Sequence, residues 1–353
     1  MARTFNVAVV GATGMVGREA IELLEERGFP VGRLRLFASG RSAGTTIAFG
    51  GTQVTVENLA HADFAGIDVI LSAPGASVSR EFAPKAVAAG AVVIDKSSAY
   101  RMDPDVPLVV PEVNGEAARG HKGIISSPNC SSIPLTLVLG PLHRAFGLKR
   151  VVVSTYQAVS GAGRKGGDEL VGQCVAMLNR RPLEIQAFPH QIAFNVVPQV
   201  EIFRPEDEGY STEETKIVNE TRKILGLPDL RITATAVRVP VLNGHSESIN
   251  VEFERPVTAD EARKVLAAAP SVVVVDDPAN GEYPMPLDAT GLDDVLVGRI
   301  RRDPTVERGL NLWLSSDNIR KGAALNAVHI AEFLLGVTPA PVVVREEEDD
   351  DEA

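Results

Sequence analysis

A cysteine at position 130 lies in a polar run that leads into an apolar segment, and it is one of only two cysteines in the 353-residue chain. Pro134 is typical of the first turn of a helix, and apolar residues continue at helical spacing to Phe146. Cys130 is therefore expected beside a helix N-terminus, whose partial positive charge favours a thiolate and so a nucleophile. A buried, unreactive cysteine is the alternative, and the loop alone favours neither.

A glycine turn near the N-terminus indicates nucleotide binding. The strand-like segment Phe5 to Val10 runs into the turn and then into an amphipathic helix that ends near Arg27. Such a turn lets the backbone approach a pyrophosphate, and the helix N-terminus stabilises its charge. The spacing is G-x-x-G-x-x-G, which departs from the commoner fingerprint, so a tight structural turn is the alternative. The residues predicted to bind the nucleotide here are Gly11, Thr13, Gly14, Met15, Val16 and Gly17.

The end of the next strand indicates which nucleotide binds. The segment Leu34 to Ala38 ends at Ser39, Arg41 and Ser42, with no Asp or Glu of the kind that NAD-binding proteins usually carry there. A guanidinium flanked by hydroxyl groups suits a ribose 2′-phosphate, which favours NADP. A solvated loop arginine is the alternative for Arg41.

Strand and helix patterns alternate through the first third of the chain. An apolar strand at residues 67–71, a helix at 78–89 and a strand at 91–94 predict an α/β fold with a Rossmann-like, doubly wound parallel sheet. Ligands of such sheets bind at the carboxyl ends of the strands. Arg101, in the loop after the strand at 91–94, is therefore a candidate anion ligand, with a surface arginine as the alternative.

The sequence becomes rich in strands beyond Cys130. The segment at 149–159 closes in another glycine loop, and an Asn243-Gly244 pair between the runs at 232–241 and 247–253 predicts a β-hairpin. His245 lies at the end of this hairpin, but nothing in the spacing selects it among the six histidines. The second cysteine, Cys174, lies among apolar neighbours and is interpreted as a packing residue.

These patterns divide the chain into four segments. Residues 1–129 are predicted to form an NADP-binding domain, and residues 130–316 a strand-rich second domain. The family resemblance described below implies that this second domain is an α+β catalytic and dimerisation domain with a mixed sheet. Residues 317–337 form a C-terminal helix that could pack on either unit. Residues 338–353 form an acidic tail, which we expect to be disordered and solubilising, with partner binding as the alternative.

The composition excludes several classes of protein. Of the formal charge of -11, most comes from Arg345 to Ala353, which holds seven carboxylates and one arginine, and no basic patch suggests nucleic acid. The two cysteines have no metal-ligand spacing with histidines and cannot make a disulfide framework, so no metal and a reducing compartment are expected. The absence of a leader or a long apolar run predicts a cytoplasmic protein without membrane contact.

With these motifs in order, the chain resembles the aspartate-β-semialdehyde dehydrogenases over essentially its whole length apart from the acidic tail. The resemblance implies NADPH-dependent reduction of L-4-aspartyl phosphate to L-aspartate 4-semialdehyde and phosphate, through a cysteine thioester. The pathway is the biosynthesis of lysine, threonine, methionine and diaminopimelate. A homodimer or dimer-based tetramer is implied, as is a C-terminal helix that returns to the nucleotide-binding domain. The motifs that carry the resemblance are the glycine turn, Ser97 to Arg101, Pro128 to Ser131, Tyr156 to Gly163, Arg238 to Val241 with Gly244-His245, and Ser316 to Asn318.

The resemblance also implies a role for each site residue. The catalytic set is the nucleophile Cys130, the general acid/base His245, Gln157, which positions the intermediate, and Asn129, which orients the thiol. The substrate set is Arg238 for the α-carboxylate, Glu214 for the α-ammonium, and Arg101 with Lys216 for phosphate. Surface charge is the alternative for Glu214 and Lys216. The cofactor set gains Ala73, Gly75, Ser160, Gly161, Gly163 and Asn318.

Two competing functions differ in residues that can be inspected. N-acetyl-γ-glutamyl-phosphate reductases use the same thioester chemistry, but usually carry Gly before the thiol and Tyr-Pro after it, where this chain has Asn129 and Ser131. A non-catalytic nucleotide-binding relative would lack the nucleophile or the base. Cys130 and His245 are both present, which favours an enzyme.

A binding measurement can test whether Arg41 contacts the 2′-phosphate of NADPH. Arg41→Ala is expected to weaken NADPH binding much more than NADH binding, because only NADPH carries the 2′-phosphate. The two dissociation constants can be measured by fluorescence titration. Equal losses for both nucleotides would refute a 2′-phosphate contact.

Overall fold

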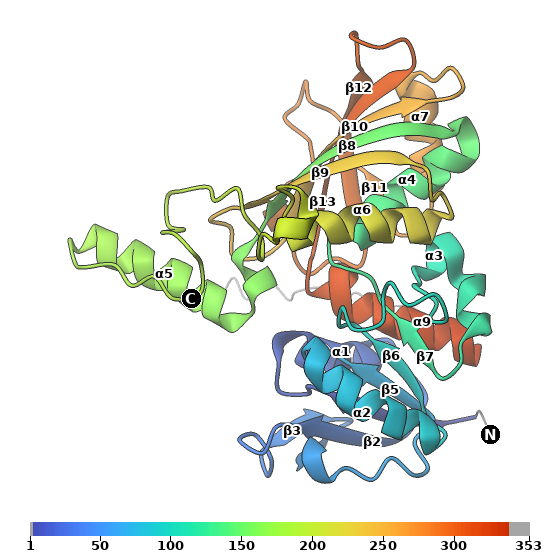
Figure 1. Ribbon diagram of the computed structural model, residues 1–353, viewed down its shortest axis with the longest axis vertical. Coiled ribbons are helices and arrows are strands. Elements are labelled where there is room, and N and C mark those ends of the chain that lie inside the picture. Colours follow the sequence, from blue (N-terminus) through green and yellow to red (C-terminus); the bar gives the residue numbers. More distant parts are fainter. Residues whose placement is uncertain (1–2, 339–353) are drawn as a thin grey trace, which may run out of the picture.

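The computed structural model describes residues 3–338, which form two β-sheets flanked by helices (Figure 1). The first sheet has seven strands in the order β3-β4-β2-β1-β5-β6-β7, and the second has six in the order β11-β12-β13-β10-β8-β9. All strands of the first sheet come from residues 5–126, and all strands of the second from residues 148–316. The architecture is the predicted α/β fold with a second, mixed sheet.

The first sheet is parallel except at its edge strand β3, which pairs antiparallel with β4. Its strands are β1 (Phe5–Val10), β2 (Val31–Ala38), β3 (Thr46–Phe49), β4 (Thr52–Asn58), β5 (Val69–Ser72), β6 (Val92–Asp95) and β7 (Ile124–Ser126). Helices α1 (Met15–Glu26) and α2 (Ala76–Ala88) cover opposite faces. Because side chains alternate along a strand, Val7 and Val9 pack with α1 while Ala8 and Val10 pack with α2.

The second sheet mixes both strand directions. Its strands are β8 (Leu148–Gln157), β9 (Arg231–Arg238), β10 (His245–Phe253), β11 (Val272–Val274), β12 (Val295–Arg302) and β13 (Gly309–Ser316). Apolar residues on one face form a core with helices α4 (Ser132–Phe146), α6 (Thr212–Leu225) and α7 (Ala259–Ala267). The remaining helices are α3 (Pro111–Asn114), α5 (Arg164–Leu178), α8 (Pro286–Ala289) and α9 (Leu325–Leu335), and short 3-10 turns span Leu59–His61, Gly115–Gly120, Val159–Ala162 and Pro205–Asp207.

The hairpin predicted at Asn243-Gly244 is wrong. β9 and β10 are not neighbours, because β8 lies between them, parallel to β9 and antiparallel to β10. The glycine is needed for a different reason: Gly244 has φ +87°, and an added Cβ would lie 2.7 Å from the carbonyl oxygen of Pro286. The Asn243 side chain donates to Asp317, so the pair packs the connection between strands rather than forming a two-residue hairpin turn.

The C-terminal helix lies against the first sheet. After β13, a π-helical turn at Arg320–Ala324 leads into α9, whose apolar residues join the core formed by β1 and α1. The guanidinium of Arg27 on α1 donates to both carboxylate oxygens of Glu332 on α9, at 2.7 and 2.9 Å. Figure 1 shows α9 between the two sheets. The tail predicted at 338–353 lies, from residue 339 on, outside the described residues.

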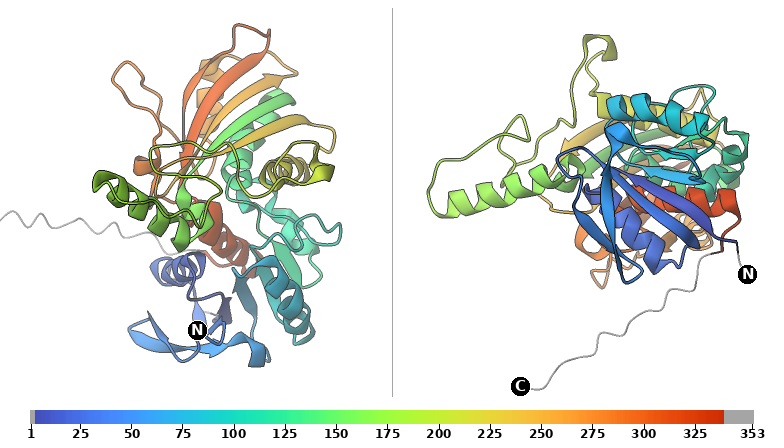
Figure 2. Two further views of the ribbon diagram at one scale, coloured as in Figure 1. Left: turned by 60° about the vertical axis from the view of Figure 1, so that its left-hand side comes forward. Right: turned by 90° about the horizontal axis from the view of Figure 1, so that it is seen from below.

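One helix projects from the rest of the molecule. α5 and the long connection that follows it extend to one side of the second sheet (Figure 2). The exposed fractions of Val171, Val175 and Leu178 on this helix are 50%, 50% and 78%. No helix among residues 3–338 is long and apolar enough to cross a membrane.

Candidate active site

A cavity of about 430 Å³ lies where the carboxyl ends of the first sheet meet the ends of β8 and β9. Its wall contains Cys130 and, of the other predicted residues, Val16, Ala73, Gly75, Arg101, Asn129, Gln157, Gly161, Lys216 and Arg238. The charged residues Lys96, Glu201 and Glu213, which the sequence did not single out, also line it. Side chains from both domains therefore surround one thiol.

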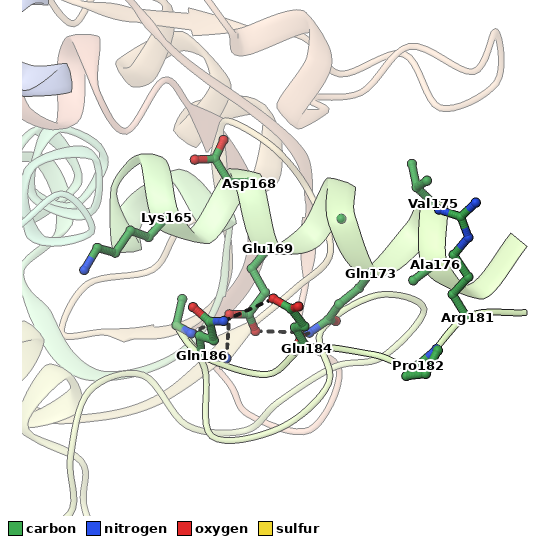
Figure 3. Close-up of a pocket in the computed structure, with 12 residues that line it drawn as sticks. Lys165, Asp168, Glu169, Gln173, Val175, Ala176, Arg181, Pro182, Glu184 and Gln186 are labelled. Atoms are coloured by element: carbon green, nitrogen blue, oxygen red, sulfur yellow. Dashed lines mark hydrogen bonds between the residues drawn. The ribbon is translucent and has the colours of Figure 1, made fainter. Parts of the chain in front are cut away.

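A second cavity, of about 580 Å³, lies under α5 and contains none of the predicted residues. Figure 3 shows Glu169 and Gln173 pointing from α5 toward the segment that carries Glu184 and Gln186. Glu169 accepts from the backbone amide of Gln186 at 2.9 Å, and Gln173 donates to the carbonyl oxygen of Glu184 at 2.9 Å. These contacts hold the connection onto the helix, so we place the chemistry in the smaller cavity, which contains the thiol.

Pairing in the second sheet explains how distant residues meet. Gln157 ends β8 and Arg238 ends β9, and the parallel register places them opposite each other. β10 runs the other way beside β8, so its first residue, His245, comes to the same end of the sheet. Three strand ends separated by many residues in sequence therefore supply three side chains to one place.

Cys130 occupies the position expected from the sequence, but its surroundings do not favour the thiolate in the way that the helix terminus alone would. Ser131 caps α4, so the thiol lies beside the helix N-terminus. Burial raises the pKa of the Cys130 thiol and the carboxylate of Glu213 raises it further, whereas Lys96, Arg238 and Arg101 oppose the shift. The net pKa lies above the ordinary value. The helix terminus therefore does not by itself bring the pKa of the thiol below its ordinary value.

Glu213 organises the polar side of the cavity. One carboxylate oxygen accepts from the side-chain amides of Asn129 at 2.9 Å and Gln157 at 3.2 Å. The other accepts from Asn129 at 3.1 Å and from the Lys216 ammonium at 3.5 Å. Gln157 also donates to the hydroxyl of Ser131 at 3.1 Å. The Glu213 carboxylate thus fixes both amide side chains that flank Cys130.

The structure does not bring Glu214 into the cavity. It is the N3 residue of a capping box with Ser211, and one carboxylate oxygen accepts from the Ser211 amide at 2.6 Å. The other accepts from the Ala236 amide at 2.8 Å. The sequence contained the signal: a Ser-x-x-Glu box commits Glu214 to the backbone, and only Glu213 is three residues from Lys216, on the same helical face.

The predicted anion ligands carry protein partners of their own. Arg101 donates to the carbonyl of Ser127 at 3.1 Å and to the Glu220 carboxylate at 2.9 Å. Lys216 pairs with Glu201 as well as with Glu213. Arg101 has unused N–H groups and Lys216 is part exposed, so both remain able to bind an anion at the cavity wall.

Arg238 and His245 are held by one residue, Ala158. Arg238 donates to the Ala158 carbonyl at 2.7 Å, and the Ala158 amide donates to Nδ1 of His245 at 3.0 Å. The neutral ring therefore carries its proton on Nε2, which is buried and has no partner within residues 3–338. Burial, then the charges of Arg238 and Lys96, hold the pKa of His245 well below its ordinary value. In this geometry His245 offers a hydrogen-bond donor from Nε2.

The nucleotide side of the cavity is built for an anion. Gly14 caps α1 without a side-chain hydrogen bond, and no acidic residue occupies the first turn, so no carboxylate of that turn neutralises the partial positive charge of the helix N-terminus. Gly17 packs so closely that an added Cβ would lie 2.2 Å from the Gly11 carbonyl oxygen. The hydroxyls of Thr13 and Ser42 lie 3.3 Å apart, which joins this turn to the loop that carries exposed Arg41. These residues fit the pyrophosphate and 2′-phosphate of NADP.

Of the remaining residues predicted to contact the cofactor, some line the cavity and others do not. Gly161 lines the cavity, while Gly163, with φ +75°, caps α5. The side-chain oxygen of Asn318 accepts from the hydroxyl of Ser160 and from the amide of Gly244, both at 3.0 Å. Ser160 and Asn318 therefore join the glycine loop to the turn before α9, and their cofactor contact stays a prediction.

Comparison with known proteins identifies the family. Residues 6–121 match the semialdehyde dehydrogenase NAD-binding domain, and residues 139–321 match the semialdehyde dehydrogenase dimerisation domain. An aspartate-semialdehyde dehydrogenase from Aquifex aeolicus is 52% identical over 335 residues, which cover 94% of this chain and 98% of that protein. The enzyme of the same name from Bacillus subtilis is 48% identical over 342 residues, 95% of this chain and 98% of that protein. The chain belongs to the aspartate-semialdehyde dehydrogenase family.

Solved structures of the family agree in fold. Aspartate semialdehyde dehydrogenase II from Vibrio cholerae, with 45% identity, has a TM-score of 0.92 over 95% of this chain and 99% of that chain, and a second structure of it is described as complexed with ASA. The enzyme from Candida albicans, described with NADP, is 28% identical with a TM-score of 0.73, over 94% of this chain and 99% of that one. The predicted family, fold, NADP dependence and oxidoreductase activity of the chain are confirmed.

Matched variants of the dehydrogenase can test whether Glu213, rather than Glu214, is the glutamate that serves the cavity. Glu213→Gln is expected to lower kcat/KM for the semialdehyde about ten- to hundredfold, because charge-assisted hydrogen bonds of about 1.5–3 kcal/mol are lost around Asn129 and Gln157. Glu214→Gln is expected to lower mainly the free energy of unfolding, by about 1 kcal/mol, because it weakens a helix cap. Steady-state kinetics and denaturant titration separate the two effects. Loss of activity in Glu214→Gln alone would restore the original assignment.

Proposed function

We propose that Cys130 is the nucleophile with which this aspartate-semialdehyde dehydrogenase converts L-4-aspartyl phosphate to L-aspartate 4-semialdehyde. The observation that carries the proposal is a single, part-exposed thiol at a helix N-terminus, in a cavity that also contains three cationic anion ligands and two amide side chains. The Vibrio cholerae enzyme described as complexed with ASA supports the same substrate for this chain.

The sulfur of Cys130 attacks the carbonyl carbon of the acyl phosphate. A carbon–sulfur bond forms, the bond to the phosphate oxygen breaks, and phosphate leaves with its electron pair, so that a thioester remains on the enzyme. Bound NADPH supplies the hydride for the reduction of that thioester. The Cys130 thiolate then departs when the reduced intermediate collapses to the aldehyde.

His245 acts on the carbonyl oxygen during these steps. Its Nε2–H is a fixed donor that stabilises negative charge on this oxygen, in a buried site where such a bond is stronger than in water. To serve instead as a base at Nε2, the ring would have to move its proton to Nδ1 and release the Ala158 amide. We therefore propose a more specific role than general acid/base: His245 begins the cycle as a hydrogen-bond donor through Nε2.

The charges of the substrate match the walls of the cavity. Arg238 would bind the α-carboxylate through its planar guanidinium, and Glu213, in place of Glu214, would bind the α-ammonium. Arg101 and Lys216 would bind the departing phosphate. Asn129 and Gln157 would hold the reacting carbonyl near Cys130, because Glu213 fixes both amides.

The nucleotide would be held by the first domain. The glycine turn and the N-terminus of α1 would bind the pyrophosphate of NADP, and Arg41 with Ser39 and Ser42 its 2′-phosphate. Ala73 and Gly75, which line the cavity with Val16, would contact the nicotinamide end. The division into 1–129, 130–316 and 317–337 is proposed on the same grounds, since each sheet lies within one segment. A reducing, cytoplasmic setting would keep Cys130 a free thiol.

The match to a dimerisation domain supports a dimer, and we propose that α5 forms part of its interface. This helix projects from the body and exposes apolar side chains, as expected for a surface covered by a second copy (Figure 2). A tetramer built from such dimers stays a prediction.

The interface can be tested by placing a charge on it. Leu178→Asp is expected to shift the protein toward a monomer in sedimentation velocity at micromolar concentration, because an unpaired carboxylate would be buried on association. Val78→Asp, an apolar position 38% exposed on α2, is the control and should leave the assembly unchanged. An unchanged dimer in Leu178→Asp would place the interface elsewhere.

The nucleophile is tested by removal of its sulfur. Cys130→Ala is expected to abolish phosphate-dependent reduction of NADP by L-aspartate semialdehyde, because no thioester can form. Absorbance at the NADPH band measures the rate, and Cys174→Ala is the matched control for loss of a thiol outside the cavity. Turnover near that of the parent enzyme in Cys130→Ala would contradict the assignment.

A further inference from the structure

Lys96 is a lysine in the cavity wall to which neither the motifs nor the proposed mechanism gives a role. It directly follows β6, and its backbone amide donates to the Ser72 carbonyl at the end of β5, at 2.9 Å. Its own carbonyl accepts from the guanidinium of Arg101. The backbone is therefore fixed at the carboxyl edge of the first sheet, and the side chain lines the cavity together with Cys130.

The carboxylate of Asp95 reinforces this placement. One oxygen accepts from the hydroxyls of Ser72 at 3.0 Å and Ser79 at 2.7 Å, and the other from Ser97 at 2.6 Å, all buried. The residues on both sides of Lys96 are thereby tied to β5 and α2. A lysine held at its base in this way keeps its ammonium within a limited part of the cavity.

Lys96 differs from the other cations of the cavity in its partners. Arg101 is paired with Glu220, Lys216 with Glu201 and Glu213, and Arg238 donates to a backbone carbonyl. Within residues 3–338, the ammonium of Lys96 makes no hydrogen bond or ion pair. The side chain of Lys96 is part exposed in the cavity wall, so its ammonium can pair with a group that reacts in the cavity.

The cavity that Lys96 shares with Cys130 makes the thiol a candidate partner, and the charge coupling between the two groups agrees with this. Burial lowers the pKa of Lys96, and the charge of Cys130 is the largest influence that raises it again. Conversely, among the cations that lower the pKa of Cys130, Lys96 has the largest effect. Four elements supply the other charged and titratable groups that face this pair. They are Arg101 in the loop after β6, Glu213 and Glu220 on α6, Arg238 on β9, and the neutral ring of His245 on β10.

We propose that Lys96 is the cation that stabilises the ionised sulfur of Cys130, both before it attacks the acyl phosphate and when it leaves the reduced intermediate. The inference rests on the proposed role of Cys130 as nucleophile. It explains how a thiol beside the carboxylate of Glu213 reaches the reactive form. The charges of Arg101 and Arg238 are directed to substrate groups, while Lys96 serves the thiol.

Alkylation of the thiol by iodoacetamide, an uncharged reagent, tests the proposal directly. In a Cys174→Ser background, Lys96→Met is expected to move the pH dependence of Cys130 alkylation toward higher pH by about one unit or more. At pH 7 the rate should fall about tenfold, because a smaller fraction of the thiol is ionised. Lys96→Arg should keep most of the rate, and Lys85→Met, at an exposed lysine of α2, should be unchanged.

Steady-state kinetics over the same pH range provide the second readout. The kcat/KM of Lys96→Met should recover as the pH rises, whereas a merely structural defect would lower it at every pH. Lys96→Gln replaces Lys96→Met if circular dichroism shows that the latter does not fold. An unshifted pH dependence of Cys130 alkylation in Lys96→Met would overturn the proposal. If the same variant also had a raised KM for phosphate, Lys96 would be assigned to phosphate binding instead. If Cys130 were not the nucleophile, Cys130→Ala would stay active. That result can be told apart from a failure of the proposal for Lys96.

Discussion

The geometry of the site depends on the hydrogen bonds that the carboxylate of Glu213 accepts. This carboxylate lies buried in the first turn of α6 and binds the side-chain amides of Asn129 and Gln157, which come from the loop before α4 and from the end of β8. A buried carboxylate is costly unless hydrogen-bonded donors surround it, so these three residues form a unit that is stable only when complete. The thiol of Cys130 is positioned by that unit. The same negative charge raises the pKa of the thiol, which creates the need for cations nearby.

The cations of the cavity come from both domains, since Arg101 follows the first sheet whereas Arg238 ends a strand of the second. The loop after β6 carries Arg101, and β7 runs toward Cys130, so the first sheet supplies positive charge at its carboxyl edge. The second sheet supplies Gln157, Arg238 and His245 from three strand ends. The π-helical turn before α9 packs closely against this arrangement: an added Cβ at Gly322 would lie 3.1 Å from the Cys130 carbonyl oxygen, so a larger residue there would push on the Cys130 loop.

Much of the fold and several site residues were predictable because local chemistry fixes them. The glycine turn, the strand and helix alternation and the helix after Cys130 follow from periodicity and from the conformational limits of glycine and proline. The predicted hairpin failed because an Asn-Gly pair reports a local turn, whereas strand neighbours depend on long-range pairing with β8. The sequence left the reactivity of Cys130 open for a related reason: the helix terminus is visible in the sequence, but the facing carboxylate of Glu213 is not.

The sequence by itself determined the family and the glycine turn, and through the family resemblance it predicted Cys130 as the nucleophile, since these depend on residue type at fixed spacing along the chain. It also contained, in the Ser-x-x-Glu pattern, the reason why Glu214 serves the backbone. Only the tertiary structure decided that Glu213 joins Asn129 and Gln157, that His245 presents Nε2 as a donor, and that Lys96 shares a cavity with Cys130. Hydrogen bonding and charge act through space over a few ångströms, and the chain brings such groups together only after both sheets have formed.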